Sequence, residues 1–386
     1  MSTDDPTTLI RALHDLRALV RDEARDADRL AALSERVTSR LIRHRLFRLW
    51  IPRRYDGLEL ALCDALSIYH AAARIDGSLG WAVMIGAGGG SFAAFLEPES
   101  AREIFGPEAA VIAGSGAPDG RAERVPGGYR VRGRWRYASG APYATTFTAN
   151  CIVTSGGEPV RDANGEPLMR AMAFPRSDVE IVETWDAAGM RATASHDFVV
   201  EDAFVPEARS FSVLKDPPKE PGPLYRLPFQ VLTELPLTAV ALGIARQALD
   251  EFAGLAAAKR PYGARGVLAE DATAGATFAR AHAEWRLAHS GMFRLAERAW
   301  AAAADGQELT AAERAEITAV CAHAVASVRR ATAELVAMAG MTGIDRGSAL
   351  ARAGLDLATL AAHFSVSPRQ LTGAGGALLA AREDQV

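Results

Sequence analysis

A short run of aromatic and hydroxyl side chains lies in the segment GRWRYASGAPYA, residues 133–144. Trp135, Tyr137 and Ser139 alternate along it, and side chains two residues apart on a β-strand point to the same face of the sheet. The pattern breaks at Gly140, which predicts the end of the strand. Such a face could pack against a neighbouring domain. It could also bind a planar polar ligand, by ring stacking on the indole and a hydrogen bond from the serine.

A second candidate for chemistry is His363, in the segment RAGLDLATLAAHFSVSP at 352–368. Leu357, Leu360 and Phe364 have the spacing of an apolar helical stripe, and His363 lies beside that stripe, at the edge of a predicted cleft. A structural role is the common one for a lone histidine. A neutral imidazole in this place could also act as a general acid or base near neutral pH.

Composition and motifs exclude several other classes of function. The chain has 386 residues, a net charge of -4 and no basic run, so we expect no nucleic-acid partner. The three cysteines and the scattered histidines lack ligand spacing, so no metal site is predicted. The clusters IGAGGG and GAGG do not lie in a βαβ unit, as a dinucleotide-binding motif would. A polar amino terminus and the lack of a long apolar run predict a cytoplasmic protein without a membrane segment.

The elements that must position these residues change in type twice along the chain. Helical periodicity dominates residues 1–107, and short strands rich in Val, Thr and aromatic residues dominate 108–214, with PGGY as a hairpin turn. Long helices with small residues on their packing faces return over 224–386, where Thr310 and Glu313 form a predicted capping box. The sequence therefore predicts an α+β protein: an N-terminal helical domain, a middle antiparallel β-domain and a C-terminal four-helix bundle.

Three stretches carry a resemblance to a known family. TWDAAGMRATASHDFVVEDAFVP (184–206), GGYRVRGRWRYASGAPYA (127–144) and AGMTGIDRGSALARAGLDLATLAAHFSVSP (339–368) are similar to segments of the acyl-CoA dehydrogenase superfamily. Their form resembles the branch of two-component flavin-dependent monooxygenases. That resemblance implies an acyl-CoA dehydrogenase-like fold and a homotetramer or dimer.

The resemblance also implies a chemistry. A separate NAD(P)H-flavin reductase would supply reduced FMN or FAD, and O2 would add to the flavin as a C4a-(hydro)peroxyflavin. One oxygen atom would then be transferred to a small organic substrate. Matching positions imply that Ser139 and His363 are catalytic and that Trp81 and His363 contact the substrate. The residues expected to contact the flavin are Ser115, Trp135, Tyr137, Ser139, Gly140, Thr193, Ser195 and Arg352. Related sequences commonly have Arg-Asp where this chain has Leu355-Asp356, so Arg352 would serve alone.

Two alternatives stay open. One is an acyl-CoA dehydrogenase-like FAD dehydrogenase or oxidase with Glu234 or Glu251 as its base. Against it, the chain has no glutamate between Glu334 and Glu383, and KRPYGARGVLAEDAT lacks the segment that holds FAD permanently in those enzymes. The other alternative is a catalytically idle scaffold with the flavin fold.

Overall fold

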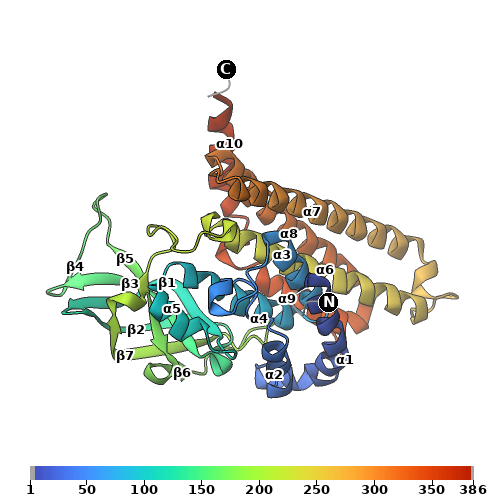
Figure 1. Cartoon of the computed structure of the whole chain (residues 1–386). Coiled ribbons are helices and arrows are strands. Elements are labelled where there is room, and N and C mark those ends of the chain that lie inside the picture. The colour runs from blue at the N-terminus through green and yellow to red at the C-terminus, as the bar shows by residue number, and fades with distance from the viewer. Residues whose placement is uncertain (1–4, 384–386) are drawn as a thin grey trace.

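The computed structural model describes residues 5–383 and has three parts in the order helices, sheet, helices (Figure 1). The N-terminal helices and the C-terminal helices lie together, and the sheet extends to one side of them. The N-terminal part consists of α1 (Pro6–Leu30), α2 (Glu35–Arg43), α3 (Leu62–Ala73), α4 (Gly77–Gly88) and α5 (Pro98–Phe105). The predicted α+β organisation is confirmed.

The middle part is one sheet with the strand order β6-β7-β2-β1-β3-β5-β8, and β4 pairs with β3. The turn at Pro126-Gly127 joins β1 and β2, as PGGY predicts, and Gly127 has a positive φ of 84°. The prediction of an antiparallel sheet is wrong for one pair, because β1 and β3 run parallel. The strands are β1 (Ile112–Val125), β2 (Gly128–Ala138), β3 (Thr146–Ser155), β4 (Glu158–Pro159), β5 (Met169–Pro175), β6 (Glu180–Val182), β7 (His196–Pro206) and β8 (Ser210–Phe211).

The C-terminal part is built around α8, which packs against α6, α7 and α10. Thr310 and Glu313 form the predicted capping box at the start of α8. The end of α10 projects from the rest of the chain (Figure 1). Among the described helices, none combines the length and the apolar character needed to cross a membrane. The helices are α6 (Val231–Ala258), α7 (Ala272–Ala304), α8 (Ala311–Met338), α9 (Ala349–Leu360) and α10 (Gln370–Glu383).

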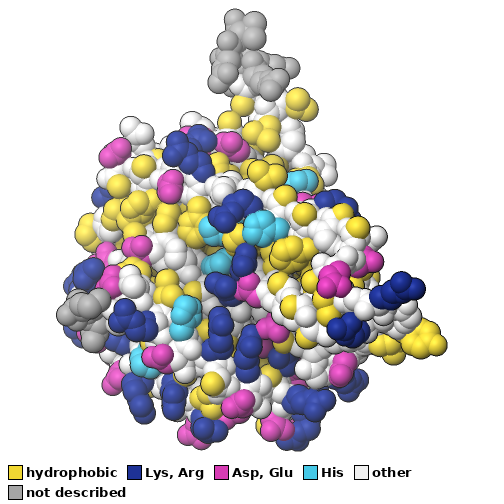
Figure 2. Space-filling model, turned by 90° about the vertical axis from the view of Figure 1, so that its right-hand side faces the viewer, with side chains coloured by type: hydrophobic (Ala, Val, Ile, Leu, Met, Phe, Trp, Pro, Cys, Tyr) yellow, Lys and Arg dark blue, Asp and Glu magenta, His cyan; other side chains and the backbone are white. Residues whose placement is uncertain are grey.

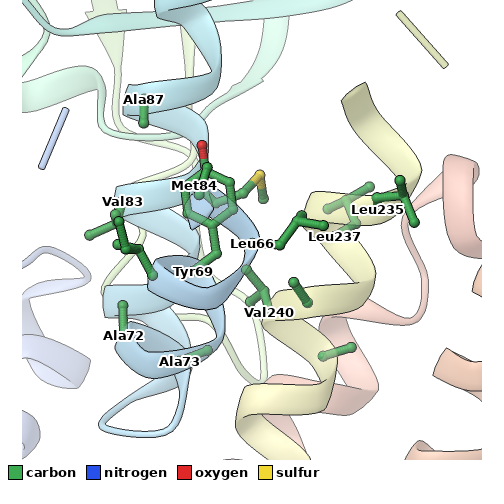
Figure 3. Packing of buried hydrophobic residues seen from close by; sticks show 14 of the residues in the cluster. Leu66, Tyr69, Ala72, Ala73, Val83, Met84, Ala87, Leu235, Leu237 and Val240 are labelled. Atoms are coloured by element: carbon green, nitrogen blue, oxygen red, sulfur yellow. The ribbon is translucent and has the colours of Figure 1, made fainter. Parts of the chain in front are cut away.

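The main core lies where α3, α4 and α6 meet (Figure 3). Tyr69 of α3, Met84 of α4 and Val240 of α6 are buried there and hold the three helices against one another. The approach of α3 to α4 depends on Gly80, because a Cβ at this position would lie 2.4 Å from the Cβ of Ala73. This packing fixes the orientation of α4, which carries Trp81.

Candidate active site

Trp81 connects the helical part of the chain to the sheet. Its indole Nε1 donates a hydrogen bond to the Ser139 Oγ over 2.8 Å. Asp76 caps α4 by accepting from the amide of Leu79, so Trp81 lies within the first turns of a capped helix. Ser139 follows directly after the end of β2. This contact therefore joins α4 to the end of β2.

Ser139 is the first member of a row of three buried hydroxyl groups. Its Oγ lies 2.7 Å from the Oγ of Ser195, which lies 2.6 Å from the Oγ1 of Thr193. The sheet register brings them together, because Ala138 at the end of β2 pairs with His196 at the start of β7. Ser139 and Ser195 flank that pair. We call Ser139, Ser195 and Thr193 the hydroxyl row.

The hydrogen bonds of the hydroxyl row have one direction. The Thr193 Oγ1 donates to the carbonyl of Met190 over 2.8 Å, because a carbonyl oxygen can only accept. The single proton of Thr193 is then used, so Ser195 donates to Thr193 and Ser139 donates to Ser195. At the other end Trp81 can only donate. Ser139 therefore has no proton left for a ligand and offers a lone pair, so it is poised to accept.

His363 contacts Trp81, the residue that donates to Ser139. Its ring makes an edge contact with the indole of Trp81 at a centroid distance of 5.9 Å. The Nδ1 accepts from the amide of Ser365, which places the ring proton on Nε2. Burial lowers the pKa of His363, so the ring is neutral at pH 7 and Nε2 is a donor. Phe364 is 73% exposed, so its predicted place in a buried apolar stripe is wrong: α9 ends at Leu360 and the chain turns before His363.

The predicted shared face of Trp135, Tyr137 and Ser139 is also wrong. Trp135 is fully buried in the core of the sheet and stacks on Phe198. Tyr137 has φ 67° and is 61% exposed, and the register of β2 against β7 shifts between Trp135 and Ala138. The left-handed residue interrupts the alternation on which the prediction depended. The Trp135 ring accordingly packs inside the sheet and offers no face to a ligand in this structure.

The other predicted flavin contacts fall into different surroundings. Gly140 lies beside the row, because its amide donates to the carbonyl of Thr193 over 2.9 Å. Tyr137 makes an edge contact with Trp185. Ser115 lies half-buried at an irregularity of β1 and accepts from the amide of Ala117. Arg352 lies 3.5 Å from both Asp28 and Asp76, within a group of acidic side chains.

Two groups in this region were missed by the sequence analysis. The Met190 carbonyl, which ends the hydroxyl row, lies in the family-like segment GMRATAS, but no side chain marks it as an acceptor. Asp356 accepts from the amide of Met190, whereas the sequence indicates it only as the second residue of the Leu355-Asp356 pair. The spacing of residues along the chain carries no sign of either contact.

The two glutamates considered as alternative bases are engaged elsewhere. The carboxylate of Glu234 accepts from Gln230 and Thr318 between α6 and α8. Burial raises its pKa. Glu251 pairs with Arg21. These partners place both carboxylates in the packing of helices.

Comparisons with known proteins show the family of the chain. Residues 235–368 match the family described as acyl-CoA dehydrogenase, C-terminal domain. The indole-3-acetate monooxygenase of Pseudomonas putida is 34% identical over 89% of this chain and 87% of its own length.

Solved structures share the fold. XiaF from Streptomyces sp., in complex with FADH2 and glycerol, superposes with a TM-score of 0.90 at 24% identity, over 97% of this chain and 96% of its own. TdsC from Paenibacillus sp. A11-2, in complex with FMN and indole, superposes with a TM-score of 0.80 at 21% identity, over 97% of each chain. The chain belongs to the flavin-dependent monooxygenases of the acyl-CoA dehydrogenase superfamily, as an oxygenase component.

Proposed function

We propose that this chain oxygenates a small aromatic compound of the indole type, using O2 and a reduced flavin bound against the hydroxyl row. The observation that carries the proposal is the direction of the hydrogen bonds, which leaves Ser139 as an acceptor. A reduced flavin ring carries a proton on N5, and an oxidised ring has a lone pair there. An acceptor at this place favours the reduced form.

The residues present fit a flavin. Ser139 would accept from N5, and Gly140 and the chain around Thr193 and Ser195 would border the ring. Tyr137, Ser115 and Arg352 stay predictions as flavin contacts, and the guanidinium of Arg352 already faces the carboxylates of Asp28 and Asp76. When bound, reduced flavin supplies the electrons that activate O2.

The protein groups have separate tasks in this proposal. The buried hydroxyl row and Trp81 keep water away from one side of the ring, as a site for an oxygen-activating flavin requires. The neutral His363 holds a proton on Nε2 and would donate it to a ligand bound beside Trp81. Such a donor stabilises negative charge that develops on oxygen during transfer.

An aromatic substrate is supported by the side chains beside the row and by a relative. The rings of Trp81 and His363 form an aromatic edge next to Ser139. Planar rings pack favourably on such an edge. The relative that is 34% identical is an indole-3-acetate monooxygenase, so indole-3-acetate is the first compound to test.

A reductase and other copies of the chain are the proposed partners. Oxygenase components receive reduced flavin from a separate reductase, which for this chain would be an NAD(P)H-flavin reductase.

We also propose a homotetramer, or a dimer. Met341, Ile344 and Leu379 are large apolar side chains exposed in the C-terminal part. Figure 2 shows further hydrophobic side chains on the projecting end of α10, below its grey tip. Light scattering after size-exclusion chromatography measures the molar mass in solution, and the mass of a monomer would contradict the proposed oligomer.

The experiment supplies the protein with a flavin reductase, NADH, FMN or FAD, and indole-3-acetate. Labelled O2 should place labelled oxygen in the product, and omission of the reductase should abolish it. Product without label, or none from any compound in a panel of indoles and phenols, would contradict the proposal. Reduction of bound FAD by an acyl-CoA would instead favour a dehydrogenase. Failure to bind any flavin would favour the idle scaffold.

A further inference from the structure

The hydroxyl row ends at the backbone carbonyl of Met190, and this residue is held in an unfavourable conformation. Its carbonyl accepts from the Thr193 Oγ1 and from the indole of Trp185 over 3.1 Å. Met190 has φ 53°, a left-handed conformation that costs about 1–2 kcal/mol for a residue with a side chain. Neighbouring contacts must therefore hold Met190 in place.

Asp356 of α9 supplies one of these contacts. Its Oδ1 accepts from the amide of Met190 over 2.5 Å, and the residue is 2% exposed. The loop lies directly on α9 at this point, because a Cβ at Gly189 would lie 2.2 Å from the carbonyl oxygen of Leu355. Only glycine permits so close an approach. The carboxyl group and the glycine together hold Met190 close to α9.

The same carboxyl group also touches the element that carries the other end of the row. A Cβ at Gly77 would lie 2.6 Å from the Asp356 Oδ2. Gly77 begins α4, about one helical turn before Trp81. One buried side chain thus contacts the helix that bears the first donor of the row and the loop that bears its last acceptor.

The charges around Asp356 show that it does not serve mainly as an ion-pair partner. Arg352 lies 3.5 Å from Asp28 and 3.5 Å from Asp76, so this cation is shared by two other acids. Burial, together with the negative charge of Asp76, raises the pKa of Asp356 well above its ordinary value. A carboxyl group keeps an oxygen acceptor in either state of protonation, so Oδ1 can accept from Met190 in both.

We propose that Asp356 is a positioning residue for the hydroxyl row. By accepting from the amide of Met190, it holds this residue against α9, and the carbonyl of the same residue gives the row its direction and so leaves Ser139 as an acceptor. Its effect on flavin rests on the proposed function, whereas its effect on the row belongs to the protein alone. These two effects can be measured separately.

The experiment compares Asp356→Asn with Asp356→Leu. Asparagine keeps an oxygen acceptor, and leucine has a similar size without one. Protein labelled with 5-fluorotryptophan gives one fluorine resonance for each tryptophan, and loss of a resonance in Trp81→Phe assigns the one from Trp81. Without flavin, the Leu variant should shift the Trp81 resonance, and the Asn variant should keep the position of the unmodified protein.

Flavin titrations form the second arm. The Leu variant should weaken binding of reduced flavin about tenfold relative to oxidised flavin, and the Asn variant should stay within about twofold. Asp28→Leu is the matched control: it removes a carboxyl group from the same cluster but from a residue that does not bond to Met190. This control should leave the Trp81 resonance unchanged.

Each outcome decides a different point. An unshifted Trp81 resonance in the Leu variant, or a shift in the Asn variant as large as in Leu, overturns the positioning role. A shifted resonance with unchanged flavin selectivity supports the positioning role and contradicts the flavin site at Ser139. If the Leu variant does not fold, Gly189→Ala supplies the same test. It pushes the loop from α9 and leaves the carboxyl group intact, and an unshifted Trp81 resonance would again overturn the proposal.

Discussion

Removing the hydroxyl group of Thr193 should weaken the preference for reduced flavin. In Thr193→Val the shape of the side chain is retained, and the carbonyl of Met190 still accepts from the indole of Trp185 and from the amide of residue 193. Ser195 then has no hydroxyl group to which it must donate. It can donate to Ser139, and Ser139 can turn its own proton toward the ligand.

The size of the effect follows from the contact that is reversed. In the proposed complex of the unmodified protein, Ser139 would accept from the N5 proton of reduced flavin, a bond worth about 0.5–1.5 kcal/mol net. With oxidised flavin, a lone pair of the Ser139 Oγ would face the lone pair of N5. A buried acceptor is then left without a donor, at a cost of about 1–3 kcal/mol. The lower ends of these ranges add to about 1.5 kcal/mol. The ratio of the oxidised to the reduced Kd should therefore fall about tenfold in the variant.

The assay is an anaerobic titration of flavin-free protein with oxidised and with dithionite-reduced FMN and FAD, which gives both Kd values. Trp81→Phe is the control. It removes the first donor but leaves Met190 to set the direction, so its ratio should stay within about twofold of the unmodified value. A folded Thr193→Val protein with an unchanged ratio would refute the argument that the row selects the redox state.

Three further predictions concern titratable groups. His363→Ala should leave the flavin Kd within about twofold and raise hydrogen peroxide formed per O2 consumed, because a donor is lost and not a flavin contact; unchanged coupling would remove His363 from the site. Burial beside His289 lowers the pKa of His70 to about 3, below its ordinary value of 6.5. The unfolded chain therefore takes up the proton first, and lowering the pH from 7 to 5 should cost about 2 kcal/mol of unfolding free energy. His70→Phe should lose less in urea unfolding at the two pH values, and an equal loss would contradict this. For Asp356 the folded pKa is raised, so stability falls as pH rises above 3.8 toward the folded value. The advantage of Asp356→Asn in urea unfolding should grow by about 1.4 kcal/mol per pH unit in that window, and a flat difference would show that the acid is charged.

The overall arrangement was predictable because it depends on periodicity and composition. Helix, strand and helix textures follow one another along the chain, and the capping box at Thr310 and Glu313 has a sequence signature. The parallel pairing of β1 and β3 was not predictable in the same way, because strand texture does not record the partner of a strand. The failure at Trp135 has a local cause. Tyrosine rarely adopts the positive φ that Tyr137 has, so its residue type does not predict that the alternation of side chains along β2 is interrupted there.

The candidate site was predictable where a local pattern or a family motif marked its residues. The resemblance indicated Trp81, Thr193 and Ser195, and local patterns together with the resemblance indicated Ser139 and His363. The structure brings these five residues together in one bonded and packed group. The surroundings of Arg352 were not foreseen, because Asp28 and Asp76 come from helices far from it in sequence. Long-range pairing of charges leaves no spacing pattern in a single sequence.

The direction of the hydroxyl row adds a property that a list of site residues does not contain. A serine can donate or accept, so the residue type of Ser139 does not predict whether the site binds a donor or an acceptor atom of a ligand. The carbonyl of Met190 removes this freedom from Thr193, and the restriction passes through Ser195 to Ser139. In the proposed site, this backbone atom would thus decide which redox form of flavin binds more tightly, without touching the ligand. Asp356, which binds the amide of Met190 and so holds the residue that bears this carbonyl, would then belong to the specificity of the enzyme as much as the hydroxyl groups do.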